Sequence, residues 1–491
     1  MAGRVEDFLN AQALSRPEAY AVEDAASGPW TYLTLAQAAA GHGAEMRGQV
    51  EPGERVMVLA ENSAAALAVM FGAWQSGATV VPVNPRQSAR EVDRVIAHAD
   101  PRRVYFIADA SADAAALAAR LGAVGGPVPV LCRSPVKAAC AEDVAVILYT
   151  TGTTGDPKGV MLTHGNVRFG AQTSAALRDV GSDDVILGVL PITHVFGLCS
   201  VLVASVHKGA FIRLAPRFDP ARALAMLRDG VTLFSGVPQM HALLMAHARS
   251  AGLDRLGSDT LRYISSGAAP LDPAWKRAAE AFYGVAVQNG YGMTESTAGI
   301  AATRHPPGHP DMSVGPALPG GEVRIDENVP GGGAGEGEVL TRGPHVMRGY
   351  FDAPRRTAEV LDGEHWLRTG DLGRVDGAGH LHILGRSKEL IIRGGFNVYP
   401  PEVEAVLTDH PDVVQSAVIG RCRDGDEEVL AFVQPRAGSG LCSDALAVFA
   451  GERLAGYKRP VRYVLSESLP AAPTGKILKH RLLDVFAAEL S

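Results

Sequence analysis

The stretch ILYTTGTTGDPKGV, from Ile147 to Val160, joins an apolar run to a loop of threonine and glycine. The apolar run predicts a buried β-strand that ends near Tyr149. None of the small residues that follow can fill a hydrophobic core. Successive backbone N–H groups in a tight turn, together with threonine hydroxyls and a lysine, can bind phosphate. The loop therefore predicts either a phosphate site or an ordinary surface hairpin.

Two known phosphate-loop patterns do not describe this loop. The Walker A pattern, G-x-x-x-x-G-K-[ST], fails because its second glycine, counted from Gly152, falls on Pro157. The lysine, Lys158, is followed by glycine and not by serine or threonine. The dinucleotide pattern G-x-G-x-x-G does not fit either. Taken alone, the loop leaves both interpretations open.

Short β-rich runs alternate with apolar helical stretches on both sides of this loop. The runs and stretches are Arg55–Leu59, Ser63–Gln75, Thr79–Val83, Val185–Leu190, Gly197–Val206, Ala210–Leu214, Pro220–Arg228 and Val231–Phe234. Repeated β-α-β units predict an α/β protein with largely parallel sheets that are covered by helices.

Two later regions differ from this rhythm. From Gly315 to Leu384, short β runs and glycine-rich turns predict a smaller antiparallel β subdomain. After Gly385 a compact α+β module is expected. Its predicted elements are a strand at Glu389–Arg393, a helix opened by Pro400-Pro401, strands at Val413–Ile419 and Val429–Gln434, and a helix at Ser443–Leu454.

Composition narrows the class of protein. The chain has 491 residues, of which 47% are hydrophobic, so it can form more than one domain. Its net charge of −7 disfavours nucleic acid as a partner. Five scattered cysteines without a Cys-x-x-Cys pair indicate a reducing compartment. The acidic start is unlike a signal peptide, and the apolar segments are too short to span a bilayer. We expect a cytoplasmic protein that is not integral to the membrane.

The motifs of the chain identify a family. TTGTTGDPKGV resembles the signature loop of the adenylate-forming superfamily, which includes acyl-CoA synthetases, the adenylation domains of peptide synthetases, and luciferases. The usual loop starts Thr-Ser-Gly, and Thr151 replaces that serine here. Six further motifs follow in the family's order: PITHVFGL (191–198), SSGAAPL (265–271), NGYGMTES (289–296), RTGDLG (368–373), GRSKELIIRGGFNVYPPEVE (385–404) and PTGKILKHRL (473–482). The chain resembles the acid–CoA ligases of this superfamily most.

The resemblance implies both an architecture and a reaction. Residues 1–385 would form a large ATP- and acyl-binding domain, residues 386–390 a hinge, and residues 391–491 a small, mobile C-terminal domain. In the family's reaction, a carboxylate attacks the α-phosphate of ATP and gives an acyl-adenylate and pyrophosphate. The thiol of coenzyme A then displaces AMP. ATP, Mg²⁺ and coenzyme A are the implied cofactors.

Most of the implied site residues would hold the nucleotide. The β- and γ-phosphates would lie against Thr150, Thr151, Gly152, Thr153, Thr154, Gly155 and Lys158. The adenine side would consist of Gly267, Ala268, Ala269, Asn289, Gly290, Tyr291, Gly292 and Met293, with Tyr291 stacked on the base. Thr294 would donate to the α-phosphate, and Glu295 and Thr151 would hold Mg²⁺. Asp371 would accept hydrogen bonds from both ribose hydroxyls, and Arg386 would contact ribose or phosphate.

The remaining implied residues serve the reaction itself. Lys476, on the C-terminal module, would offset the repulsion between the attacking carboxylate and ATP. Rotation at Lys388 would then bring Gly394 and Gly395 to the site, where glycine leaves room for the pantetheine arm. His194 would lie at the mouth between the acyl pocket and the pantetheine tunnel. The alternative for His194 is a half-buried structural histidine.

The identity of the acid is less sharply indicated. The implied pocket segments, Val195–Leu198, Ser235–Pro238, Gly267–Ala269 and Gly290–Met293, are apolar or small, which favours a fatty or aryl acid. Three alternatives stay open: a dicarboxylate–CoA ligase, an enzyme that loads a carrier protein, and a nucleotide-binding module without catalysis. The sequence also leaves a homodimer open.

Overall fold

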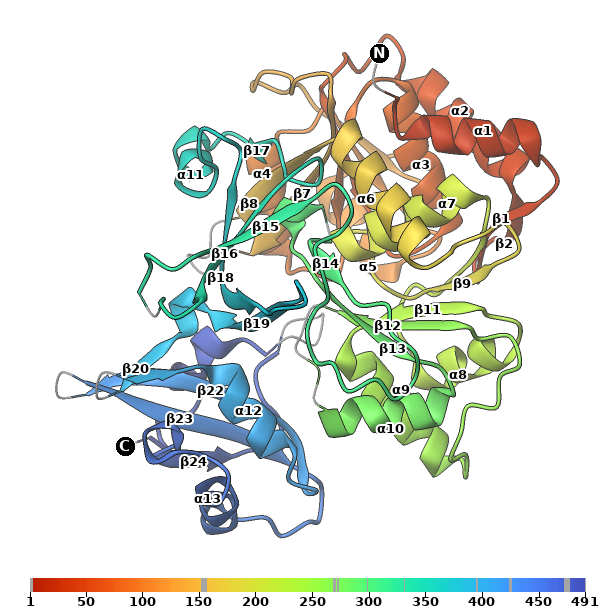
Figure 1. Ribbon diagram of the computed structural model, residues 1–491. Coiled ribbons are helices and arrows are strands. Elements are labelled where there is room, and N and C mark those ends of the chain that lie inside the picture. Colours follow the sequence, from red (N-terminus) through yellow and green to blue (C-terminus); the bar gives the residue numbers. More distant parts are fainter. Residues whose placement is uncertain are drawn as a thin grey trace.

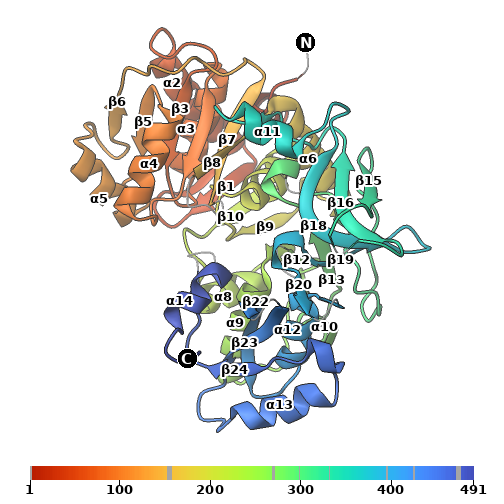
Figure 2. The same cartoon turned by 90° about the vertical axis from the view of Figure 1, so that its left-hand side faces the viewer.

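The structure is a computed structural model, shown from two sides in Figures 1 and 2. The described residues are 3–151, 157–267, 271, 273–297, 299–330, 332–393, 396–423, 426–471 and 477–490. They form two large mixed sheets with covering helices, a small antiparallel sheet, and a C-terminal module at one end of the molecule. In the described chain, no helix combines the length and the apolar character that a membrane span needs.

The first large sheet carries the loop that opens the analysis. Its strand order is β17-β8-β7-β4-β3-β5-β6. The strands are β3 (Arg55–Leu59), β4 (Thr79–Val83), β5 (Arg103–Phe106), β6 (Val130–Cys132), β7 (Val144–Thr151), β8 (Pro157–Thr163) and β17 (Gly349–Tyr350). β3, β4, β5 and β7 are parallel to their neighbours within this group, whereas β8 runs antiparallel to β7. The predicted strands at 55–59 and 79–83 are confirmed.

The second large sheet carries the adenine-side motifs at the ends of parallel strands. Its order is β14-β13-β12-β11-β9-β10-β1-β2. The strands are β1 (Tyr20–Asp24), β2 (Gly28–Thr31), β9 (Val185–Gly188), β10 (Phe211–Leu214), β11 (Leu233–Gly236), β12 (Tyr263–Gly267), β13 (Val287–Tyr291) and β14 (Ala301–Ala302). Six of these strands, in the order β13-β12-β11-β9-β10-β1, pair in parallel with their neighbours.

The helices of the large domain lie between and around these two sheets (Figure 1). They are α1 (Glu6–Ser15), α2 (Tyr32–Met46), α3 (Ala64–Gln75), α4 (Ala89–Ala99), α5 (Ala112–Leu121), α6 (His164–Leu177), the π-helix η1 (Phe196–Val203), α7 (Ala204–Lys208), α8 (Pro220–Arg228), α9 (Pro238–Ser250), α10 (Pro273–Tyr283) and α11 (Pro354–Val360). The predicted helix at 220–228 is confirmed, and the stretch at 197–206 is helical but begins as a π-helix.

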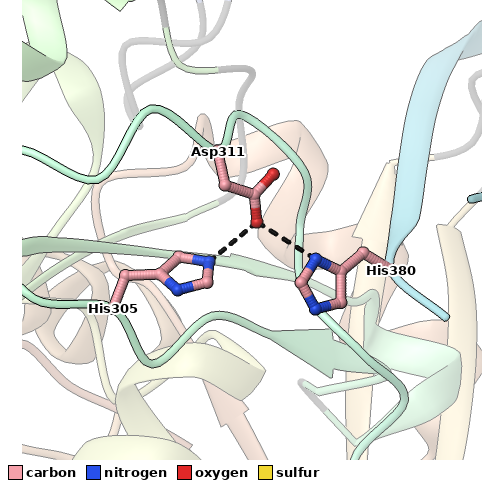
Figure 3. Close-up of side chains that lie close together, drawn as sticks. All are labelled: His305, Asp311 and His380. Carbon is pink, nitrogen blue, oxygen red and sulfur yellow. Dashed lines mark hydrogen bonds and ion pairs between the residues drawn. The ribbon is translucent and has the colours of Figure 1, made fainter. Parts of the chain in front are cut away.

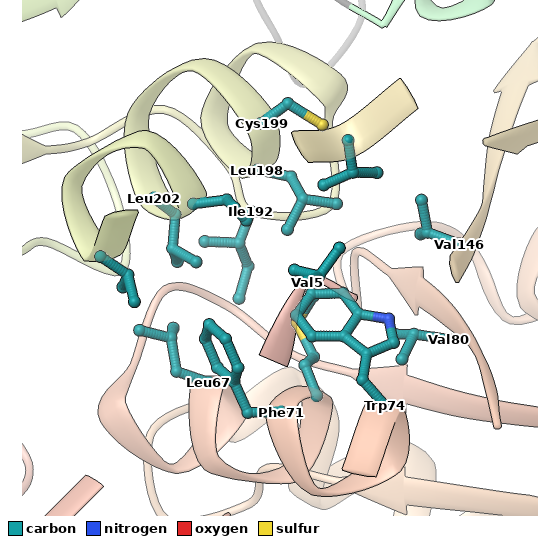
Figure 4. Close-up of a cluster of buried hydrophobic side chains, with 14 of the residues drawn as sticks. Val5, Leu67, Phe71, Trp74, Val80, Val146, Ile192, Leu198, Cys199 and Leu202 are labelled. Carbon is teal, nitrogen blue, oxygen red and sulfur yellow. The ribbon is translucent and has the colours of Figure 1, made fainter. Parts of the chain in front are cut away.

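Helix α3 is the centre of the main core. It is apolar all round and almost wholly buried, as expected of a helix covered on every side. Ser63 caps its start by accepting a hydrogen bond from the Ala66 N–H. Figure 4 shows Leu67, Phe71 and Trp74 from α3 facing Leu198 and Leu202 from η1. This packing joins the two large sheets into one body.

The predicted antiparallel subdomain is present, with one difference. The strands β15 (Glu322–Asp326), β16 (Glu336–Arg342), β18 (Leu367–Val375) and β19 (Leu381–Arg386) form a four-stranded antiparallel sheet. The intervening strand β17, however, pairs with β8 of the first large sheet. Its Tyr350 is thereby placed beside the threonine-glycine loop. The stretch from 315 to 384 is thus shared between two sheets.

The C-terminal module has the predicted α+β character. It contains η3 (Ser387–Glu389), β20 (Ile391–Arg393), β21 (Phe396–Val398), α12 (Pro400–Thr408), β22 (Val413–Arg423), β23 (Asp426–Pro435), α13 (Ser443–Gly451), η4 (Gly456–Lys458), β24 (Arg462–Leu465), η5 (Lys479–Arg481) and α14 (Leu482–Val485). Several predicted boundaries were wrong. The strands expected at 413–419 and 429–434 are longer, at 413–423 and 426–435. The strand expected from Glu389 starts at Ile391, because 387–389 form a 3₁₀ turn, and the helix expected to reach Leu454 ends at Gly451.

Candidate active site

The two strands that flank the threonine-glycine loop pair as a β-hairpin. β7 and β8 pair up to Thr150 opposite Lys158 and Thr151 opposite Pro157. The hairpin and the phosphate-site interpretations are therefore compatible. Gly152, Thr153, Thr154 and Gly155, as well as the side chain of Thr151, lie outside the described residues. Their predicted phosphate contacts stay predictions.

Lys158, at the start of β8, is connected through Tyr350 to Glu295, the residue predicted to hold the metal. Its Nζ lies 5.5 Å from the centre of the Tyr350 ring, within reach of a cation–π interaction. The Tyr350 hydroxyl in turn donates to Glu295 Oε1 over 2.8 Å. Burial and then the Glu295 charge raise the pKa of Tyr350, so the hydroxyl keeps its proton and acts as the donor. Tyr350 therefore contacts both Lys158, through its ring, and Glu295, through its hydroxyl.

Thr294 and Glu295 share one 3₁₀ turn, η2 (Thr294–Ser296), and both are buried. The Met347 N–H donates to the Glu295 carbonyl over 2.8 Å. Thr297 follows in the left-handed region, with φ 50°, and its hydroxyl donates to the His345 carbonyl over 2.6 Å. These bonds fix the turn on both sides. Thr297 was missed from sequence, because its role depends on a partner 48 positions away.

Tyr291, Asp371 and Arg386 meet at the adenine and ribose side of the predicted site. The Tyr291 hydroxyl donates to Asp371 Oδ2 over 2.5 Å, and Arg386 Nε lies 3.3 Å from Asp371 Oδ1. β18 and β19 place Asp371 directly opposite Arg386. Burial and then the Asp371 charge raise the pKa of Tyr291 well above its ordinary value. Asp371 therefore joins two residues that the sequence places 95 positions apart.

The other adenine-side residues lie at the ends of β12 and β13. The two parallel strands place Gly267 next to Gly290. Asn289 is used within the fold, because its amide donates to the Ser313 carbonyl over 3.0 Å and its Oδ1 accepts from the Gly290 N–H. Gly292 and Met293 follow and are half-buried. Ala268 and Ala269 lie outside the described residues.

His194 is exposed, not half-buried as the structural alternative expected. Its Nδ1 accepts a hydrogen bond from the Phe196 N–H over 3.3 Å, where the π-helix η1 begins. Phe196 lies close to the end of β12, since a Cβ on Gly267 would come 3.3 Å from its ring. π-Turns of this kind are frequent at functional sites. The predicted gating role of His194 stays a prediction.

In the C-terminal module, the structure describes Lys388 but not the other predicted site residues. Lys388 is exposed in the 3₁₀ turn η3. Lys479 Nζ lies 2.9 Å from Glu389 and 2.8 Å from Glu404. Burial opposes the charge, but the two carboxylates outweigh burial and raise the pKa of Lys479. Lys479 was missed from sequence, and its two ion pairs join the last motif to the segment predicted to be the hinge. Lys476, Gly394 and Gly395 lie outside the described residues.

With this geometry established, comparison with known proteins defines the class. Residues 9–351 match the family "AMP-binding enzyme", and residues 402–476 match "AMP-binding enzyme C-terminal domain". The chain therefore belongs to the AMP-binding enzyme family, as its motifs indicated.

Individual relatives cover most of the chain. A feruloyl-CoA synthase from Amycolatopsis sp is 37% identical over 88% of this chain and 88% of its own length. The long-chain-fatty-acid–CoA ligase FadD13 of Mycobacterium tuberculosis is 30% identical over 89% of both chains. The crystal structure of ATP-bound MatB from Rhodopseudomonas palustris is similar over 100% of both chains, with 30% identity and a TM-score of 0.86.

Proposed function

We propose that this chain is an AMP-forming acid–CoA ligase that activates a carboxylic acid with an uncharged aryl or fatty tail. The observation that carries the proposal is the junction at Asp371. One buried carboxylate holds both Tyr291 and Arg386 at the end of β13, and a carboxylate with two oxygens can also accept from vicinal ribose hydroxyls. Glu295 and Lys158 both contact Tyr350 and would serve the phosphate side of the nucleotide.

In the first half-reaction, an oxygen of the substrate carboxylate attacks the α-phosphorus of ATP. The bond from that phosphorus to the bridging oxygen breaks, and pyrophosphate leaves with the electron pair. The charges brought together are negative, so fixed cations and N–H donors lower the barrier. Lys158 and the hairpin tip would receive the departing phosphates, Thr294 the α-phosphate, and Lys476 the attacking carboxylate.

The residues present fit a Mg²⁺ ion. Glu295 is a single buried carboxylate, and one of its oxygens already accepts from Tyr350. Mg²⁺ sites that serve nucleotides commonly use one or two carboxylates and complete the shell with phosphate oxygens and waters. The ion would supply charge neutralisation at the phosphates. Glu295, oriented by Tyr350, would hold it from the protein side.

In the second half-reaction, the thiol sulfur of coenzyme A attacks the acyl carbon. A C–S bond forms, the thiol proton is released to water, the bond from that carbon to the AMP oxygen breaks, and AMP leaves with the electron pair. In this step, the pantetheine arm must occupy the position that the Lys476 loop occupies in the first half-reaction. The proposed domains are 1–385 and 391–491, with residues 386–390 as the hinge. Rotation at the exposed Lys388 would exchange the lysine loop for Gly394-Gly395.

The tail of the acid is proposed from the pocket and from the relatives. Val195, Phe196 and Gly267 are apolar or lack a side chain, and Phe196 lies beside the end of β12. Feruloyl-CoA synthase and long-chain-fatty-acid–CoA ligase are both names for relatives that activate acids with uncharged tails. We place the enzyme in the cytoplasm, where its five free cysteines would stay reduced. A homodimer stays open, and light scattering of the purified chain decides it.

A pyrophosphate-release screen tests this function. The purified chain is given ATP, Mg²⁺ and one acid at a time, chosen from ferulate, cinnamate, octanoate, palmitate and malonate. We expect release with an aryl or fatty acid, and thioester formation when free coenzyme A is added. Preference for malonate would support the dicarboxylate alternative. Thioester on a carrier protein but not on free coenzyme A would support the carrier alternative. No release with any acid would contradict catalysis.

A further inference from the structure

Three side chains outside the nucleotide site meet at one point, as Figure 3 shows. His305 Nε2 lies 2.7 Å from Asp311 Oδ2, and His380 Nδ1 lies 3.3 Å from the same oxygen. The three atoms all lie within 4.8 Å of one another. We propose that His305, Asp311 and His380, the His-Asp-His cluster, form a site for a first-row divalent transition metal such as Zn²⁺. Nothing in this proposal depends on the ligase reaction.

The fold brings the cluster together from two distant segments. His305 and Asp311 lie in the loop that joins β14 to β15, and His380 lies in the turn between β18 and β19. Gln288 of β13 holds His305 by two bonds, since its Oε1 accepts from the His305 N–H over 2.9 Å and its amide donates to the His305 carbonyl over 2.7 Å. The backbone N–H of His380 donates to Asp376 over 3.0 Å. Both imidazoles are therefore anchored through their backbones.

A second layer of contacts orients the three donors before any ion arrives. Ser313 donates to both oxygens of Asp311, through its N–H over 2.8 Å and its hydroxyl over 2.7 Å. His309 stacks on His305 with ring centres 3.9 Å apart and an interplanar angle of 9°. Hydrogen-bonded carboxylates and oriented imidazoles are typical of metal sites, where they fix the ligands and tune their basicity.

The donor set indicates which kind of cation fits. Two imidazoles and one carboxylate suit Zn²⁺ and its first-row neighbours, whereas Mg²⁺ prefers oxygen ligands alone. Zn²⁺ lies about 2.0–2.1 Å from such donors, which for tetrahedral geometry places the donor atoms roughly 3.4 Å apart. The 2.7 Å and 3.3 Å separations from Asp311 are close to this value, and the two imidazole donors, within 4.8 Å of each other, would move closer together around an ion. The side chains are 16%, 12% and 26% exposed, so the ion can enter and water can complete its shell.

The position of the cluster gives the ion a structural consequence. The Ser313 carbonyl accepts from Asn289, two residues before Tyr291. His380 ends the hairpin whose strands carry Asp371 and Arg386. A bound cation would therefore link the two segments that support the nucleotide site. A ligand that binds only the folded state also raises its stability.

The test uses full-length, tag-free protein that has been stripped with a chelator. ZnCl₂ is titrated by calorimetry, and CoCl₂ is followed by its visible d–d absorption, which reports the ligand field. We expect one ion per chain, an increase in thermal midpoint with Zn²⁺, and no competition from excess Mg²⁺. His380→Ala and Asp311→Asn should each weaken binding by roughly 10–100-fold or more.

His382→Ala is the matched control. His382 Nε2 pairs with Asp376 over 2.8 Å on the same hairpin but belongs to no three-donor group among the described residues. Its loss should leave the metal affinity unchanged. Binding that persists in both His380→Ala and Asp311→Asn would overturn the proposal. So would the absence of any d–d band in the unaltered protein, because the cluster would then be a carboxylate shared by two imidazoles and nothing more.

Discussion

The proposed nucleotide site of the large domain and the proposed hinge segment before the C-terminal module are built in opposite ways. Tyr291, Glu295 and Asp371 are held by hydrogen bonds to side chains of other elements, and the last two are buried. In the module, Lys388 is exposed and Phe396 is 57% exposed. The first region is preorganised to receive charge, and the second presents its residues at a surface. This difference suits the proposed mechanism, in which the C-terminal module presents two of its surfaces in turn to a nucleotide site that does not move.

The contact between the two regions supports this difference. The Tyr399 hydroxyl donates to Glu336 of β16 over 3.2 Å, and Pro401 lies beside Gly385 of β19. Within the module, by contrast, Lys479 is held by two carboxylates. The Tyr399–Glu336 hydrogen bond is half-buried and contributes about 1–3 kcal/mol to stability, so we expect rotation of the module as a unit to cost less than distortion of its packed interior. Four predictions test this account, from the largest expected effect to the smallest.

Lys476→Ala should have the largest effect and should separate the half-reactions. Removal of a fixed donor at a developing charge typically costs on the order of 10²–10³-fold in rate. We expect that loss in pyrophosphate release, and little loss in thioester formation from supplied acyl-adenylate. Lys458→Ala, which removes a lysine paired with Glu402 in the same module, is the control and should leave both rates near normal. Equal losses in both half-reactions of Lys476→Ala would contradict the assigned role.

Asp371→Asn should come next, because it removes the charge at the junction while keeping its size. A hydrogen bond to a charged group contributes about 1.5–3 kcal/mol, or roughly 10–150-fold in kcat/KM for ATP. Tyr291→Phe keeps the ring and removes one of the contacts of Asp371, so its effect should be smaller. Steady-state kinetics with varied ATP measures both. An Asp371→Asn enzyme with unchanged kcat/KM would show that this carboxylate does not contact the nucleotide.

Lys388→Pro should slow thioester formation, the second half-reaction, severalfold and should leave adenylation unchanged. Proline fixes φ and so restricts the backbone change that rotation requires. Thioester formation from acyl-adenylate should fall, while pyrophosphate release in a single turnover stays near normal. Lys388→Ala, which removes the charge and keeps the backbone free, is the matched control. Normal turnover by Lys388→Pro would count against rotation at this position.

The smallest effect concerns acid stability, and it is confined to the large domain. Burial lowers the pKa of His164 to about 3 and those of His241 and His345 to about 4, against about 6.5 when unfolded. The unfolded chain therefore binds more protons, so the free energy of unfolding decreases as pH falls from about 6.5 toward 4.

Urea unfolding monitored by tryptophan fluorescence measures this loss, because all four tryptophans lie before residue 386. His345→Gln should reduce the slope by about one proton, or about 1.4 kcal/mol per pH unit. A stability that does not change between pH 7 and pH 5 would contradict the burial of these imidazoles.

Local sequence signals were sufficient to predict the helices and strands whose ends are marked by capping or turn residues. The strand at Thr79–Val83 is β-branched at every position except Pro82, and the helix at Pro220–Arg228 begins with proline after an aspartate cap. Both were predicted to the residue. The motif order likewise identified Tyr291, Glu295 and Asp371 as candidates before their contacts were known.

Long-range pairing could not be predicted in the same way. β17 has two residues and pairs with a strand almost 190 positions earlier, so no local sequence pattern predicts this strand. The π-helix at Phe196–Val203 has the same apolar composition as an α-helix. Lys479 and the His-Asp-His cluster acquire their partners only through tertiary structure. The exposure of His194 depends on how η1 packs, and not on its neighbours in sequence.

The most direct test of the central claim is a crystal structure with a non-hydrolysable acyl-adenylate mimic. We expect the adenine against Tyr291, the ribose hydroxyls on Asp371, and the phosphate analogue facing Thr294 and the Thr150–Lys158 hairpin. A mimic bound anywhere else on the chain would contradict the assignment of this region as the nucleotide site.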